Sequence, residues 1–469
     1  MRRGAGDERR RVCMNRLKRL LTSGDPAESW RGLSARTRWF VLACVVIAIG
    51  LFVSQLVEIP KRSAMRGSDN TFNYLWLRSL MVGGDLDFRD DLDACNTLVP
   101  ELKTTIPQLP LTKTGVVTNK YGVGWSLVSV PFYLAADGIV GTGRALGVWN
   151  LERDGYNWVY QVCLQTGHFL LAGFALFLAY RVTRRWCARE PAVLGVAMLW
   201  AASPMLYYQT SNLSMSHGVT FFALVLCLYA LQRTEAAPER WLWWMLAGAG
   251  LGLATITRYQ TAVFGLVPVW AILMQVRTTK NLPAMSRQGL AFAAGAVPFV
   301  ALQMVAWKIV YGSWLLYSYG AEAEPFYWTK PVFAEVLFSA KHGLFYWHPL
   351  LLAGCAGLIA VAWKRGGLLW AGVVVTAISV YVNAAWWCWW FGSSFGSRAF
   401  EGAFLFFMVG LAWCFERLSE RATRWLFAAG ASLVVWNLLW LLLYRMALVS
   451  RNDAVTYGDV VRAWWKLIT

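Results

Sequence analysis

Eleven apolar runs dominate the sequence, and a run of about 20 apolar residues is long enough to cross roughly 30 Å of hydrocarbon as a helix. Because lipid offers no hydrogen-bonding partner to exposed backbone, a chain with this many runs folds as a helical bundle in a membrane. The composition agrees, since 57% of the 469 residues are hydrophobic and only 15% are charged. The runs lie near residues 39–59, 156–180, 191–208, 215–231, 241–257, 261–276, 289–310, 347–363, 367–387, 399–415 and 425–447.

One further apolar segment, YGVGWSLVSVPFYLAADGIVG at 121–141, contains two glycines near its start and a proline, and counting it as a span would reverse every later loop. If it does not span, the short loops on one side carry 14 Lys or Arg and those on the other side carry 2. Cytoplasmic loops are the cationic ones. The sequence therefore predicts a surface helix at 121–141 and a cytoplasmic N-terminus.

The spans divide the chain into a tail, a membrane domain and a C-terminal segment. We predict an all-α polytopic membrane protein with about eleven transmembrane helices and two long external loops that carry interfacial helices. The net charge of +18 reflects cationic loop ends, which membrane topology requires, and does not indicate nucleic-acid binding. The basic N-terminus lacks a small-residue cleavage pattern and reads as a retained tail. The predicted parts are the cytoplasmic tail 1–37, the membrane domain 38–447 with external loops 60–155 and 311–346, and an external interfacial segment 448–469.

Polar residues gather at the predicted outer ends of the spans. Gln165 and His168 share one helical face, and His217, Arg258 and Arg398 lie at outer ends of later spans. Unpaired polar groups are costly in hydrocarbon, so this distribution favours a wet cavity that opens outward beneath the two long loops. The alternatives are interhelical hydrogen bonding for His168 and snorkelling to the interface for Arg398.

The first external loop is rich in carboxylates. Asp69 lies near the start of a short predicted amphipathic helix, NTFNYLWLRSLM, and Asp85 and Asp87 follow a Gly-Gly pair. A carboxylate beside a developing alkoxide can accept its proton, as transfer to a hydroxyl requires. Helix capping or solvation are the alternative roles for each aspartate. Their oxygens would also suit Mg²⁺ or Mn²⁺, although no metal or cofactor motif is present.

Several stretches together resemble the GT-C superfamily of membrane glycosyltransferases. They are the acidic motif soon after the first span, NKYGVGWSLVSVPFYL, RVTRRW, SPMLYYQTSNLSMSHGVTFF, GLATITRYQTAVFG, FSAKHGLFYWHPLLLAGCAGL and WWFGSSFGSRAF. The branch they resemble is the protein O-mannosyltransferase and aminoarabinose-transferase type, similar to glycosyltransferase family 39. This resemblance implies a polyprenyl-phosphate sugar donor, an acceptor hydroxyl on the external face, inversion at the sugar and a first-loop aspartate as general base.

The resemblance also implies roles for individual residues. Asp69 would be the base. The family often has an Asp-Glu pair where this chain has Asp69-Asn70, which makes Asp85 or Asp87 a candidate for the second acid. The implied donor-phosphate ligands are Lys120, Arg258 and Arg398, and the candidate sugar or acceptor contacts are His217, Tyr259, Gln165 and His168.

We therefore predict a hexosyl or pentosyl transferase in the cell (plasma or inner) membrane, with its active site outside. Its partners would be the lipid-linked donor, membrane lipid and a cell-envelope acceptor, which could be a protein, a lipid or a polysaccharide. A transporter or flippase for a glycolipid is the alternative, and a non-catalytic assembly or receptor protein is a third class. A transporter would line the inner half of its spans with polar residues too, and the sequence has few there.

Overall fold

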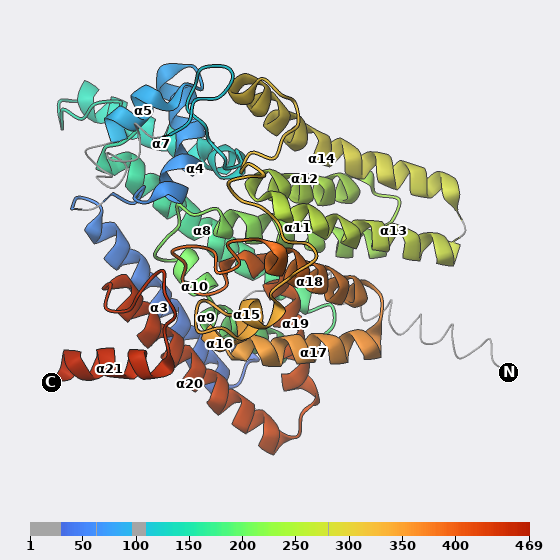
Figure 1. Cartoon of the computed structure of the whole chain (residues 1–469). Helices are drawn as coiled ribbons and strands as arrows, with labels where there is room; N and C mark the ends of the chain where they lie inside the picture. Colours follow the sequence, from blue (N-terminus) through green and yellow to red (C-terminus); the bar gives the residue numbers. More distant parts are fainter. Residues whose placement is uncertain (1–29, 62, 96–108, 280) are drawn as a thin grey trace.

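The computed structural model describes residues 30–61, 63–95, 109–279 and 281–469, so most of the predicted tail 1–37 and part of the loop 60–155 lie outside the described residues. The described chain is helical, with isolated bridges but no named strand (Figure 1). The long helices are α3 (Ala35–Glu58), α7 (Gly124–Ala145), α8 (Trp158–Thr183), α9 (Arg189–Ala201), α11 (His217–Ala236), α12 (Trp241–Thr257), α13 (Leu266–Thr279), α14 (Leu282–Tyr311), α17 (Leu350–Arg365), α18 (Leu368–Ala385), α19 (Glu401–Arg417), α20 (Glu420–Arg445) and α21 (Tyr457–Ile468). The short ones are α4 (Ser68–Arg78), α5 (Phe88–Cys95), α10 (Met205–Tyr208), α15 (Phe333–Phe338), α16 (Leu344–Trp347), the π turn η1 (Ser79–Gly83) and the 3₁₀ turns η3 (Tyr259–Gly265) and η4 (Arg398–Phe400).

Every predicted apolar run coincides with helical structure, which confirms the all-α membrane class. Within the described residues, however, seven helices are both long and apolar enough to cross a membrane, so the count of eleven is not confirmed. The run at 191–208 is broken after Ala201, and α12 and α17 have only 17 and 16 residues. The seven are α3, α8, α11, α14, α18, α20 and the segment Arg398–Arg417, which includes α19.

The ambiguous segment forms α7, a helix of 22 residues that is not among those seven. It packs on α8 and on α4, and α4, α5 and α7 gather at one end of the molecule (Figure 1). The predicted amphipathic character of α4 is wrong: its residues 70–78 are all buried, because α7 and neighbouring segments cover the helix around its circumference.

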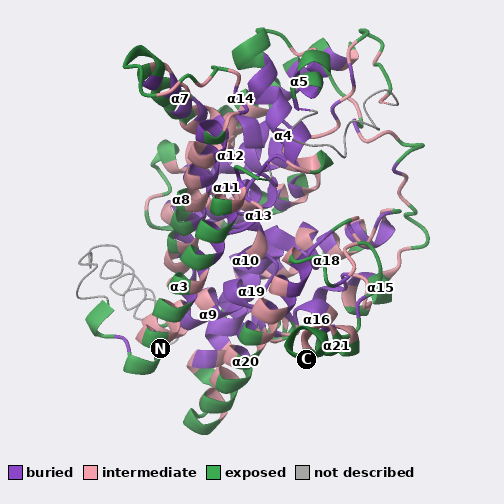
Figure 2. Ribbon diagram, turned by 90° about the vertical axis from the view of Figure 1, so that its left-hand side faces the viewer, coloured by how far each residue is buried: buried purple, intermediate pink, exposed green. Residues whose placement is uncertain are grey.

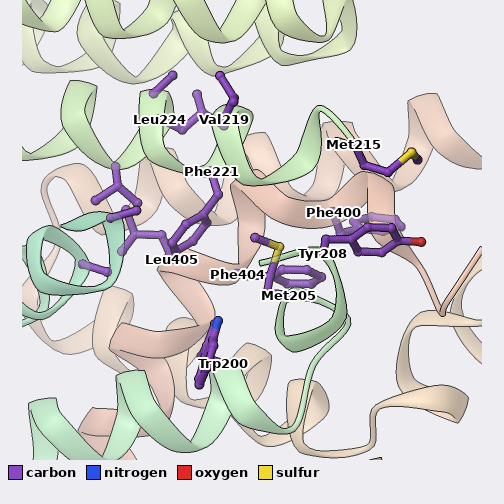
Figure 3. Packing of buried hydrophobic residues seen from close by; sticks show 14 of the residues in the cluster. Trp200, Met205, Tyr208, Met215, Val219, Phe221, Leu224, Phe400, Phe404 and Leu405 are labelled. Atoms are coloured by element: carbon purple, nitrogen blue, oxygen red, sulfur yellow. The ribbon is translucent and has the colours of Figure 1, made fainter. Parts of the chain in front are cut away.

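The core centres on α19, which is buried along almost its whole length between α9, α11 and α17 (Figure 2). Figure 3 shows Phe404 and Leu405 of α19 among Phe221 of α11, Trp200 of α9 and Tyr208 of α10. Arg398 begins the turn η4, and Glu401 begins α19 directly after that turn. The packing of α19 therefore fixes the position of both charged residues at one end of the bundle.

Candidate functional site

A cavity of about 450 Å³ opens at the end of the bundle where α4 and the start of α7 lie. Its wall combines the two predicted external loops with the ends of α12 and α18. Five cationic and two anionic side chains line it, which leaves a formal excess of three positive charges. The charged lining residues are Arg66, Asp69, Lys120, Arg258, Glu324, Arg398 and Arg451, and the aromatic ones include Tyr121, Tyr319, Trp386 and Trp387.

Asp69 faces this cavity from the first turn of α4. The helix is capped by Gly67, whose φ of 82° favours glycine, and the Asp69 carboxylate does not cap it. Instead, it accepts a hydrogen bond from the hydroxyl of Tyr121. It also forms an ion pair with Arg398, whose Nη2 lies 3.0 Å from Oδ2 of Asp69. Burial alone would raise the pKa of Asp69, but Arg398 and Tyr121 oppose it and hold that pKa below its usual 3.8. Asp69 is therefore ionised at neutral pH.

Arg398 is positioned by the loop that precedes α19. At Gly396, φ is 65°, and a Cβ atom there would lie 2.2 Å from Nε2 of His348, so only glycine fits. The neighbouring Ser397 donates a hydrogen bond to the carbonyl of His342. The Arg398 side chain is only 13% exposed and contacts Asp69, so it does not snorkel to the interface.

Arg258 approaches the cavity from the end of α12. Its Nε lies 3.0 Å from Oε1 of Glu401, and its Nη1 lies 3.5 Å from Nε2 of His217. Glu401 and His217 are 1% and 0% exposed, so they form a buried layer behind the guanidinium. Burying a carboxylate is costly unless a cation compensates it, and Arg258 supplies that cation.

A close approach of backbones brings Lys120 and Tyr121 beside Arg258. A Cβ atom on Gly124 would lie 2.1 Å from Oγ1 of Thr257, so the start of α7 can rest directly on the end of α12. Lys120 forms an ion pair with Glu324, and its ammonium lies 4.9 Å from the ring centre of Tyr319. The two predicted external loops thus meet across this pair.

Asp85 and Asp87 lie elsewhere, because neither lines the cavity. Asp85 accepts hydrogen bonds from the Ser79 hydroxyl at 3.3 Å and from the backbone N–H of Asp87 at 2.9 Å. Asp87 forms an ion pair with Arg89, which together with its hydrogen bonds lowers the pKa of Asp87. Both aspartates serve the turn that links η1 to α5.

The two polar residues predicted on one face of α8 are buried between helices. His168 bonds through Nε2 to the Ser129 hydroxyl of α7 at 2.7 Å, and its ring stacks on Trp125. Gln165 donates to the Ser214 hydroxyl at 2.8 Å. Neither lines the cavity. The His168 contact matches the alternative of interhelical hydrogen bonding, whereas Gln165 bonds to the turn between α10 and α11.

The other two candidate contacts lie just behind the cavity wall. His217 is fully buried against Arg258 and Glu401, with Nδ1 3.5 Å from Oε2 of Glu401. The ring of Tyr259 packs against Trp307 and Tyr319, and its hydroxyl is buried. Both residues therefore support residues of the wall and do not line it themselves.

Two comparisons with known proteins bear on this arrangement. A family model described as dolichyl-phosphate-mannose-protein mannosyltransferase matches residues 161–302. The crystal structure of ArnT from Cupriavidus metallidurans bound to undecaprenyl phosphate superposes with a TM-score of 0.50 at 16% identity, covering 92% of this chain and 69% of that one. The chain has a GT-C-like fold. No curated protein matched the sequence.

The GT-C-like fold confirms the resemblance drawn from the sequence, and the family model that matches residues 161–302 is that of a mannosyltransferase. Sequence reasoning missed several residues of the site, among them Tyr121 and Glu324 in the cavity wall and Glu401 behind it. Glu401 stands three residues after Arg398 at the start of an apolar run, which is a detectable signal for a buried ion pair. Glu324 lies in a loop without periodicity, where no signal marks it.

The predicted magnesium or manganese ligands do not come together in the GT-C-like fold. The Asp69 carboxylate contacts Arg398 and Tyr121, while Asp85 and Asp87 lie outside the cavity. Among the described residues, no group of three or more His, Cys, Asp or Glu side chains could hold a metal ion. These side chains therefore do not fit a site for Mg²⁺ or Mn²⁺ among the described residues.

Proposed function

We propose that the protein transfers a sugar from a polyprenyl-phosphate donor to a hydroxyl of a cell-envelope acceptor. One observation carries the proposal: Asp69 shares a single cavity with Lys120, Arg258 and Arg398. A carboxylate and a net positive wall are what such a transfer requires, because the acceptor must lose a proton and the leaving group is a phosphate. The similarity to ArnT, whose structure contains undecaprenyl phosphate, supports the donor class.

In the proposed reaction, the acceptor hydroxyl gives its proton to Asp69 while its oxygen attacks the anomeric carbon. The bond from that carbon to the phosphate oxygen breaks, and polyprenyl phosphate leaves with the electron pair. Attack from the face opposite the phosphate inverts the configuration. The cations offset the charge that develops on the leaving oxygen, and the buried layer of Glu401 and His217 holds Arg258 in place for this task.

The pairing of Asp69 with Arg398 couples donor binding to the strength of the base. In the structure, the guanidinium depresses the carboxyl pKa. A donor phosphate that draws Arg398 toward itself weakens this ion pair, and burial then raises the pKa of Asp69. A more basic carboxylate is a better proton acceptor at neutral pH, so the base becomes stronger when the donor is present.

We also propose that the site lies on the external face of the cell membrane, with the N-terminus in the cytoplasm. The support is the uneven distribution of Lys and Arg between the two sets of short loops. The acceptor, whether protein, lipid or polysaccharide, would enter from that side. The same proposal includes a membrane domain at 38–447, with external loops at 60–155 and 311–346.

The test is transfer of radiolabelled sugar from a panel of synthetic polyprenyl-phosphate sugars to extracted envelope acceptors by the purified protein. Label in the acceptor together with free polyprenyl phosphate supports the proposal. In parallel, sealed vesicles report whether the intact donor crosses the membrane. Movement of uncleaved donor, without transfer for any sugar in the panel, would contradict it and favour the transporter alternative.

A further inference from the structure

A second hollow, of about 860 Å³, lies between α17 and α19 at the ends of these helices remote from the cavity. Glu401 begins α19 next to Arg258, whereas Arg417 ends it, and 16 helical rises separate the two by about 24 Å. The hollow is therefore independent of the proposed transfer site.

The helices are in close contact just before the hollow. A Cβ atom on Gly357 of α17 would lie 2.2 Å from the carbonyl oxygen of Gly410 of α19, so the two backbones touch. On α19, both lining residues come after Gly410 in the sequence. On α17, every lining residue except Ala356 comes after Gly357. The hollow thus begins where the two packed backbones diverge.

One wall of the hollow is apolar and exposed. Ala356, Ile359, Ala360 and Trp363 recur every three or four residues and share one face of α17. All four are exposed, and Trp363 is 76% exposed. In a bilayer this stripe faces acyl chains, and tryptophan at its end is typical of the membrane interface.

The rim beyond this stripe is cationic. The guanidinium carbons of Arg365 and Arg417 lie 5.4 and 4.4 Å from the ring centre of Trp413, which is itself only 6% exposed. Lys364 adds a third exposed cation. Across the described part of the chain, none of the three forms an ion pair, and the adjacent Glu416 accepts a hydrogen bond from the backbone of Ala188.

We infer that this hollow binds one anionic phospholipid, whose phosphate lies between Arg365 and Arg417 and whose acyl chain lies along the stripe of α17. Charge complementarity carries the assignment, because three cations without carboxylate partners flank an apolar surface. The N-terminal 29 residues do not fit, since they carry eight Lys or Arg against four Asp or Glu. Polyprenyl phosphate offers the same phosphate, but no carboxylate lines the hollow, so it lacks the base of a transfer site.

Native mass spectrometry of the delipidated full chain, titrated with phosphatidylglycerol or phosphatidylcholine, tests the inference. The wild type should bind one phosphatidylglycerol in preference to phosphatidylcholine. The double variant Arg365→Gln/Arg417→Gln should lose about 30-fold in affinity for phosphatidylglycerol, since each cation near a charged lipid contributes on the order of 1 kcal/mol. Equal binding of both lipids by the wild type would overturn the inference.

Two controls sharpen the experiment. Arg421→Gln/Arg424→Gln removes the same charge from exposed positions of α20, and it should leave phosphatidylglycerol binding unchanged. An equal loss in both double variants would mean general electrostatic attraction and would overturn the site. Arg365→Lys/Arg417→Lys retains the charge and should retain most of the binding. Displacement of phosphatidylglycerol by undecaprenyl phosphate at lower concentration would overturn the assignment to a phospholipid.

Discussion

Asp69 and Asp91 lie 22 residues apart in the same predicted loop, and both pair with an arginine, yet they contact very different surroundings. Asp69 faces the cavity, its side chain is 24% exposed, and it pairs with Arg398, which is distant in the sequence. Asp91 is fully buried and pairs with Arg78 of the adjoining α4, whose guanidinium also lies over the ring of Tyr156. Access to a cavity therefore separates a candidate base from a structural carboxylate, and acidic character alone does not.

Asp69→Asn should give the largest loss of transfer, because asparagine cannot accept the acceptor proton. General-base catalysis contributes 10² to 10⁴, so we expect a loss of about 10³-fold in kcat with donor binding retained. Steady-state transfer and donor binding by the purified variant measure this. A kcat near the wild-type value would mean that Asp69 is not the base, despite its position in the cavity.

Arg258→Gln should be the next most damaging change. It removes a cation from the leaving group and leaves Glu401 buried without its partner. We expect a loss of about 10²-fold in kcat/KM, similar to the loss of one charge-stabilising donor. The double variant Arg258→Gln/Glu401→Gln should restore folding but not rate. Recovery of both would mean that Arg258 has only a structural role.

Arg398→Gln should alter the pH profile. With Arg398 present, the pKa of Asp69 lies below 3.8, so the base stays ionised as pH falls toward 5. Without it, the strongest of the groups that oppose burial is lost and that pKa rises, so the rate should decline at a higher pH than in the wild type, by a tenfold loss per pH unit below the new pKa. If the rate declines at the same pH in both proteins, protonation of Asp69 does not limit the rate, and its role as the base is contradicted.

Asp91→Ala should affect stability and not chemistry. Removing one partner of a buried ion pair leaves Arg78 uncompensated and costs about 3 kcal/mol. We expect a lower thermal unfolding temperature with unchanged turnover per folded molecule. Burial raises the pKa of Asp91 to about 6, so its ionised form is less stable when folded and the wild type should lose stability as pH rises from 4 through 6.

Asp87→Asn should have the smallest effect. Its carboxylate pairs with Arg89 at a partly exposed turn, where such pairs contribute little. Transfer rates within about twofold of the wild type are expected, since surface pairs are worth less than about 1 kcal/mol. A loss as large as that of Asp69→Asn would mean that Asp87 takes part in transfer, and would contradict the distinction between aspartates inside and outside the cavity.

Hydrophobic run length sufficed to predict the helices, because a span must satisfy its own backbone. It did not separate α9 from α10 or predict that α4 is buried on all sides, since both depend on neighbours. Helical periodicity placed Gln165 and His168 on one face of α8 but could not say that this face meets α7 and the Ser214 segment instead of the cavity. The charged residues at span ends helped to predict the site, because a buried charge is costly unless it pairs with an opposite charge.

The partner choices themselves required the structure. Asn70, the departure from the acidic pair of the resembled family, donates to Asn212 at 2.8 Å and forms no ion pair. Two further carboxylates lie near Asp69: Glu324 lines the cavity and Glu401 lies behind its wall, 255 and 332 residues further along the chain than Asp69. Contacts over such separations depend on how loops close across the bundle, and local sequence does not encode them.

The most direct measurement is an experimental structure of the protein with undecaprenyl phosphate, a probe that carries the leaving group without the sugar. We expect the phosphate to lie within hydrogen-bonding distance of at least two of Lys120, Arg258 and Arg398, with Asp69 beside the position of the departing sugar. A phosphate bound outside this cavity, with Asp69 facing away from it, would contradict the proposed transfer at Asp69.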